Sequence, residues 1–113
     1  MKPQNFLFIL SDQHHRMASG AYGHPVVQTP HLDALAARGT RFQNAYTNCP
    51  ICVPARASLA TGRYVHQTGY WDNGHPYDGG IPSWHQRLRE QDFRCDAIGK
   101  LHYKGQGTDH GFS

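Results

Sequence analysis

The residue best suited to chemistry is Cys52, which opens the run Cys-Val-Pro-Ala-Arg. Pro54 fits the first turn of a helix, where its missing N–H costs nothing, and good helix formers follow until Gly62. Cys52 is therefore expected just before a helix N-terminus, whose roughly half positive charge would stabilise negative charge developing on residue 52. Arg56, four residues further on, can turn back to hold that group.

Cys52 also forms a Cys-x-x-Cys pair with Cys49, and this spacing supports a second kind of chemistry. Such a pair before a helix can be a redox site or half of a zinc site. A complete zinc site of this kind needs a second pair, and Cys95 stands alone. A thiol redox or Cys/His metal-binding module without hydrolase activity therefore remains the alternative from a different functional class.

Two further groups of polar residues follow apolar, strand-like runs. Asp12 and Gln13 come shortly after an apolar run of five residues, and their carboxylate and amide oxygens are ligands of hard divalent cations. Lys100 and His102 follow another such run and alternate, so that both would face the same side of an extended segment. Histidine is the residue type best suited to proton transfer near neutral pH.

Together these segments resemble type I sulfatases of the alkaline phosphatase superfamily. The matching residues are Cys-x-Pro-x-Arg at 52–56, Asp-Gln at 12–13 and Gly-Lys-Leu-His at 99–102. The resemblance implies a sulfuric ester hydrolase that cleaves a sulfate ester to an alcohol and sulfate. It also implies that Cys52 is oxidised to formylglycine by a formylglycine-generating enzyme. One hydroxyl of the hydrated aldehyde would attack sulfur and the second would expel sulfate, which an unmodified thiol could not do.

The resemblance also implies a role for each matched residue. Arg56 would hold the formylglycine side chain, Lys100 would contact the sulfate group, and His102 would bond the hydroxyl that loses its proton. One divalent metal ion is implied, with calcium as the first choice and magnesium or manganese as alternatives. Its ligands in this chain would be Asp12, Gln13 and the formylglycine derived from Cys52.

The Asp-Gln pair at 12–13 narrows the expected substrate. Sulfatases often carry two aspartates at this place, and an Asp-Gln pair is similar to choline sulfatases and phosphonate monoester hydrolases. Choline sulfate or another small sulfate ester is thus the first expectation. A phosphonate monoester or phosphodiester hydrolase is the alternative, because a singly charged phosphodiester resembles a sulfate ester in charge and shape. His75 and Asp78, in a long loop predicted over residues 65–80, are candidates for substrate contact.

Three segments are predicted to form strands: residues 6–10, 40–46 and 93–98. The first is continuously apolar, as expected for a central strand buried on both faces of a parallel sheet. Asp12 and Gln13 would then lie at its C-terminal end, the edge at which open α/β sheets bind ligands. The third would deliver Lys100 and His102 to the site.

Two further segments are predicted to be helical. Residues 30–38 follow a threonine cap, begin with proline and precede Gly39, with Leu32, Leu35 and Ala36 on the inner face. Residues 84–91 follow a serine cap with glutamine three residues on. Strands that alternate with helices indicate an α/β fold. The resemblance specifies the N-terminal part of an alkaline phosphatase-like (sulfatase) fold, with a mainly parallel sheet flanked by helices.

The length of 113 residues allows one domain at most. Because sulfatases are several times longer, residues 1–113 are expected to be the N-terminal portion of a sulfatase catalytic domain, incomplete at the C-terminus. We expect this portion alone to hydrolyse nothing, since Asp12 and Gln13, even with the formylglycine, cannot fill a six-coordinate calcium site.

The charge and hydropathy patterns exclude several partners. The formal charge of +3 is spread along the chain without a block, so nucleic-acid binding is not expected. The five-residue apolar run near the start is too short for a signal peptide or a membrane span. These patterns favour a cytoplasmic protein without a membrane partner, whose partners are a small sulfate ester and the formylglycine-generating enzyme. Homo-oligomerisation of the whole protein stays open.

Overall fold

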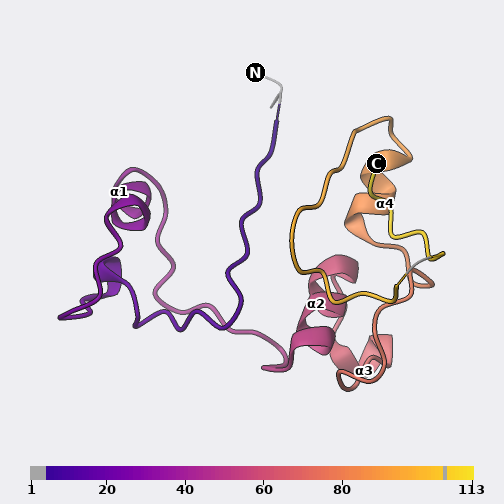
Figure 1. The fold of residues 1–113 in the computed structure, drawn as a ribbon, viewed down its shortest axis with the longest axis horizontal. Coiled ribbons are helices and arrows are strands. Elements are labelled where there is room, and N and C mark those ends of the chain that lie inside the picture. Colours follow the sequence, from indigo (N-terminus) through magenta and orange to yellow (C-terminus); the bar gives the residue numbers. More distant parts are fainter. Residues whose placement is uncertain (1–4, 106) are drawn as a thin grey trace. The chain divides into compact units, whose positions relative to one another are not determined.

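The computed structural model describes residues 5–105 and 107–113 of the chain, drawn as a ribbon in Figure 1. These residues form a 3-10 helix, η1 (Gly20–Tyr22), and the α-helices α1 (Pro30–Arg38), α2 (Cys52–Thr61), α3 (Val65–Thr68) and α4 (Trp84–Arg89). The longest of these described helices has ten residues, and none could cross a lipid bilayer. The chain divides into two compact units, Met1–Ala45 and Tyr46–Ser113.

The first unit joins η1 to α1 through the side chain of Asp33. Asp33 Oδ1 accepts the N–H of Ala21 at 2.7 Å and the hydroxyl of Thr29 at 2.8 Å. Thr29 Oγ1 in turn accepts the N–H of Gly20 at 2.9 Å. A Cβ atom on Gly20 would clash with the carboxylate of Asp33, so a larger residue at this position would force that side chain to shift.

The helix predicted over residues 30–38 is confirmed, but its predicted inner face is not. Leu32 and Leu35 are about half exposed, and Ala36 is only partly buried. The reason is that polar groups of Asp33 and Thr29 connect α1 to its neighbour, whereas no described sheet covers its leucines. The helical spacing of apolar residues thus predicted the helix correctly, but the burial that it predicted for these side chains was wrong.

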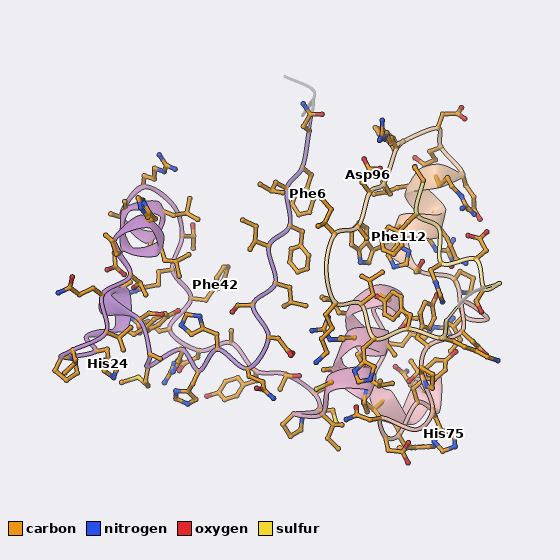
Figure 2. All side chains as sticks on the ribbon, viewed as in Figure 1. Phe6, His24, Phe42, His75, Asp96 and Phe112 are labelled. Atoms are coloured by element: carbon orange, nitrogen blue, oxygen red, sulfur yellow. The ribbon has the colours of Figure 1, made fainter. Side chains whose placement is uncertain are left out.

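The three predicted strands are absent from the part of the chain that the structure describes. In residues 6–10 the rings of Phe6 and Phe8 stack at 6.3 Å between centroids, while Phe6 is 80% exposed. Figure 2 shows Phe6 and Phe42 on segments without regular structure, and Ile98 is fully exposed. A strand needs a neighbouring strand to satisfy its backbone N–H and C=O groups. The apolar patterns predicted burial, but no partner strand is present among the described residues.

The core of the second unit forms around α2. Ala57 and Ala60 of this helix are buried against Tyr77, which has no exposed surface. Partly buried side chains of Tyr70, Ile81 and Tyr103 pack around them. The short helix α3 lies inside the stretch that was predicted to be all loop, so that prediction was wrong for its first four residues.

Helix α4 begins with the predicted capping box. Ser83 Oγ accepts the N–H of Gln86 at 3.2 Å, and Gln86 Oε1 accepts the N–H of Ser83 at 2.7 Å. The helix ends at Arg89, two residues before the predicted end. Its buried His85 stacks on Phe112 at 4.3 Å between ring centroids, and Figure 2 shows Phe112 beside this helix.

Gly111 is a position at which we expect an added methyl group to destabilise the second unit strongly. It is buried with a φ of 88°, and a Cβ atom there would lie 2.5 Å from the backbone N of Gln86. Gly107 has a similar φ of 89° but open space around it. We expect Gly111→Ala to lower the free energy of unfolding by about 3 kcal/mol and Gly107→Ala by about 1 kcal/mol. Urea denaturation measures both, and equal losses would show that the close approach to α4 contributes nothing.

His85 should make the stability of the second unit sensitive to acid. It is 1% exposed, its Nε2 has no hydrogen-bond partner among the described residues, and burial lowers its pKa below the ordinary value of 6.5. A histidine with a lowered folded pKa binds protons more readily when unfolded. The stabilisation that comes from burying neutral His85 is therefore fully present above about pH 6.5. It is lost as the pH falls towards the pKa of His85 in the folded protein.

The free energy of unfolding should accordingly fall between pH 7 and pH 5, with a slope of at most about 1.4 kcal/mol per pH unit from this residue. Urea denaturation at several pH values measures the slope. His85→Gln should flatten it, whereas the exposed His66→Gln should leave it unchanged. The groups that face His85 are Ser83, Trp84, Tyr103, His110 and Phe112. An unchanged slope in His85→Gln would assign the acid sensitivity to another group.

Candidate functional site

Cys52 is the first residue of α2, one position further into the helix than predicted. It is a free, partly buried cysteine. The residue before it, Ile51, has no side chain that could cap the helix. A loop residue does so instead, because Asn73 Oδ1 accepts the N–H of Val53 at 3.0 Å. The helix N-terminus that carries residue 52 is thus completed from 20 residues further along the chain.

Arg56 connects the helix of Cys52 to the Lys100 segment. Its side chain is only 8% exposed, and its guanidinium donates to the backbone oxygen of Lys100 at 2.5 Å. The positive charge of Arg56 also acts on Tyr103, where burial outweighs it and raises the pKa to about 12. The structure therefore brings together two of the motifs predicted to form the site.

The segment from Gly99 to His102 does not have the regular extended conformation that was predicted. Gly99 has a φ of 99° and His102 a φ of 59°, so Lys100 and His102 do not alternate along a strand. His102 is partly buried, and its Nδ1 has no hydrogen-bond partner within the described ranges. A non-glycine residue with positive φ is uncommon, and such conformations concentrate at functional sites. The role of His102 in the site stays a prediction.

Asp12 and Gln13 lie in the first unit on an exposed bend. Gln13 also has a positive φ, of 58°. The donor chemistry of this pair fits a hard divalent cation, because both side chains offer oxygen atoms. In residues 5–105 and 107–113 no group of three or more His, Cys, Asp or Glu side chains could hold a metal ion. Asp12 and Gln13 therefore stay predicted ligands that need further donors.

The loop between α3 and α4 links α2 to the Lys100 segment. Tyr77 packs on α2 through its ring, and its backbone oxygen accepts the N–H of Lys104 at 2.8 Å. The hydroxyl of Tyr70 donates to Asp78 at 2.6 Å, and burial together with this bond raises the pKa of Tyr70 to about 12.

The same loop holds the two residues proposed to contact substrate, His75 and Asp78. His75 Nδ1 lies 2.7 Å from Asp72 Oδ1, and both side chains are exposed; Figure 2 shows His75 at the edge of the loop. Asp78 is engaged by the hydroxyl of Tyr70. Both candidates thus take part in the internal structure of the loop, and their contact with substrate stays a prediction.

Sequence patterns missed the residues that tie these segments together, chiefly Asn73 and Tyr77. The run Asp-Asn-Gly at 72–74 predicts a turn, but nothing local indicates a bond to Val53. The same holds for Asn48, whose Oδ1 accepts the hydroxyl of Ser58 at 3.1 Å. These contacts join residues that are 10 to 20 positions apart, which a local pattern does not specify.

Residues 4–113 match the family model described as Sulfatase. The chain belongs to the sulfatase family. Family membership confirms the predicted resemblance and implies the alkaline phosphatase-like α/β fold class for this chain, although its described residues form no strands. The assignments of Cys52, Arg56, Lys100 and His102 to individual roles stay predictions.

Several curated relatives of this chain are named as sulfatases. The N-acetylglucosamine-6-O-sulfatase of Bacteroides thetaiotaomicron is 33% identical over 111 residues, covering 96% of this chain and 20% of the relative. The choline-sulfatase of Rhizobium meliloti is 36% identical over 108 residues, covering 96% and 21%. Human arylsulfatase K is 34% identical over 102 residues, covering 90% and 19%. The chain thus spans about a fifth of the length of the curated relatives it matches.

Proposed function

We propose that the whole protein containing these residues is a formylglycine-dependent sulfatase that hydrolyses a sulfate ester to an alcohol and sulfate. The main support is the bond from buried Arg56 to the backbone of Lys100, within a chain of the sulfatase family. This bond joins the motif that carries Cys52 to the motif that carries Lys100 and His102. Residues 1–113 would supply part of the catalytic domain.

Each of the candidate residues around residue 52 would have a separate role in the reaction. Formylglycine made from Cys52 would supply a hydrated aldehyde as the nucleophile. The N-terminus of α2 would stabilise negative charge on that residue, because the partial positive charge of a helix is concentrated there. Arg56 would fix the position of the formylglycine, and Lys100 would bind the sulfate group by its charge. His102 would hold the proton of the hydroxyl that must ionise.

Asp12 and Gln13 would contribute oxygen donors for one divalent metal ion, calcium by preference and magnesium or manganese as alternatives. When bound, such an ion supplies positive charge that offsets the charge of the sulfate group and of the nucleophile. One carboxylate and one amide carry a single negative charge to the metal ion, whereas two aspartates would carry two.

A small sulfate ester is the proposed substrate, with choline sulfate the first to test. The Asp-Gln pair at 12–13 and the similarity to a choline-sulfatase support this choice. The same pair keeps a phosphonate monoester or phosphodiester as the second candidate. Rates with choline sulfate, an aryl sulfate and an aryl phosphodiester on the whole protein would rank these substrate classes.

Mass spectrometry of the peptide that contains residue 52 tests the proposal directly. The whole protein should be produced together with a formylglycine-generating enzyme and without it. We expect a peptide of lower mass than the cysteine form only in the sample produced with that enzyme. The rate of sulfate release should be proportional to the fraction of protein that carries the lighter peptide. Full activity with an intact cysteine would contradict the proposal. A disulfide or zinc-bound cysteine in place of formylglycine would favour the thiol module instead.

A further inference from the structure

The side chain of Asn73 contacts the helix turn that carries residue 52. Its Oδ1 accepts the N–H of Val53 at 3.0 Å, and that N–H belongs to the peptide group that joins residues 52 and 53. We propose that Asn73 is a positioning residue, which orients the nucleophile at residue 52 through this bond. The inference rests on the proposed function.

The backbone N–H groups in the first turn of α2 have few nearby hydrogen-bond acceptors. The N–H groups of an initial helical turn have no partners within the helix. Pro54 has no N–H, and the N-cap residue Ile51 offers no side-chain acceptor. Ala55 already donates its N–H to the carbonyl oxygen of Ile51 at 3.0 Å. Asn73 therefore caps the donor next to residue 52, a task that a serine or aspartate at the N-cap would ordinarily perform.

Asn73 is itself held in place by the residues on either side of it. Asp72 Oδ1 accepts the N–H of Gly74 at 2.8 Å and lies 2.7 Å from His75 Nδ1, which closes a tight turn around Asn73. Further along the same loop, the ring of Tyr77 is buried against α2. The loop thus meets α2 at two places, at its N-terminus through Asn73 and along its side through Tyr77.

This arrangement has a consequence for the peptide plane between residues 52 and 53. A hydrogen bond to an amide N–H restricts rotation of that plane, and the plane sets the direction in which the side chain of residue 52 leaves the helix. A displacement of a reacting group by about 1 Å can lower a rate by about a hundredfold. Loss of the Asn73 bond should therefore affect the rate of the chemical step more than substrate binding.

The test compares Asn73→Ala and Asn73→Asp in the whole protein, with Asn44→Ala as the control at an exposed asparagine of the first unit. Rates are divided by the formylglycine content of each sample. We expect Asn73→Ala to lower kcat about tenfold while KM changes less than about twofold. Asn73→Asp should restore kcat to within about threefold of wild type, because its carboxylate oxygen can accept the same N–H.

Two further measurements separate positioning from folding. Amide exchange at Val53 should be faster in Asn73→Ala and close to wild type in Asn73→Asp and Asn44→Ala. Thermal unfolding should show that each variant is folded at the assay temperature. An unchanged kcat in Asn73→Ala would overturn the inference, and so would a loss of kcat that Asn73→Asp does not restore.

Failure of the proposed function would look different. In that case the wild-type protein itself would contain no formylglycine and release no sulfate, and the positioning role would fall with it. An active, formylglycine-containing wild type combined with an equally active Asn73→Ala would overturn the positioning role alone.

Discussion

Replacement of Cys52 by alanine should abolish the hydrolysis of sulfate esters by the whole protein, lowering kcat by at least about 10⁴-fold. Alanine removes the only precursor of the proposed nucleophile. Cys52→Ser should be nearly as inactive, because serine has one hydroxyl and cannot expel the bound sulfate by regenerating an aldehyde. Initial rates with choline sulfate and an aryl sulfate measure the loss, with circular dichroism to show that the fold is retained.

Cys49→Ala is the matched control for this prediction. Cys49 shares the Cys-x-x-Cys spacing with Cys52 but has no place in the formylglycine mechanism. We therefore expect Cys49→Ala to keep activity within about threefold of wild type, as expected for a change outside the catalytic groups. If both variants lost the activity to the same extent while residue 52 remained cysteine, the thiol redox alternative would be favoured.

Replacement of Arg56 by alanine is expected to affect both stability and activity. The side chain is buried, and its loss would leave the backbone oxygen of Lys100 without this donor and open a cavity beside α2. We expect the free energy of unfolding to fall by about 2–3 kcal/mol. In protein that remains folded, kcat should fall by at least about a hundredfold, because residue 52 and the Lys100 segment would lose their connection. Urea denaturation and steady-state kinetics measure the two effects.

Arg63→Ala provides the control for Arg56, since Arg63 is exposed just beyond the end of the same helix. Its effect on stability should stay within about 0.5 kcal/mol. Arg56→Lys should recover part of the stability but little of the activity, because lysine lacks the planar fork of the guanidinium. Wild-type stability and kcat in Arg56→Ala would show that the bond to Lys100 has no importance.

The parts of the fold that could be predicted are those determined by neighbouring residues. Pro30 at the start of α1, Gly62 after α2 and the Ser83–Gln86 capping box each act within one turn, and the three helices form where these signals indicate. The family was also predictable, because its motif around Cys52 is a continuous run. The family and the order of its motifs along the chain could therefore be predicted from the sequence alone.

The parts that could not be predicted depend on groups far apart in the chain. The apolar run at residues 6–10 indicates burial, but pairing into a sheet depends on other strands. The bond from Arg56 to Lys100 spans 44 positions, and the cap from Asn73 spans 20. The positive φ of His102 could not be predicted either, because only a small fraction of histidines adopt it and no neighbouring residue indicates it. Sequence patterns therefore gave candidate site residues without predicting the contacts that connect them.

The burial of Val53, Pro54 and Arg56 places a limit on the time available for activation. An enzyme that recognises the proline and arginine beside Cys52 cannot reach these side chains once α2 has packed against Tyr77. The proposed oxidation would then have to take place while residues 52–56 are still an accessible peptide. Since helices form within microseconds once their packing partners are available, modification competes with folding. If the proposed function holds, a molecule that folds first would keep its thiol and would lack the proposed nucleophile.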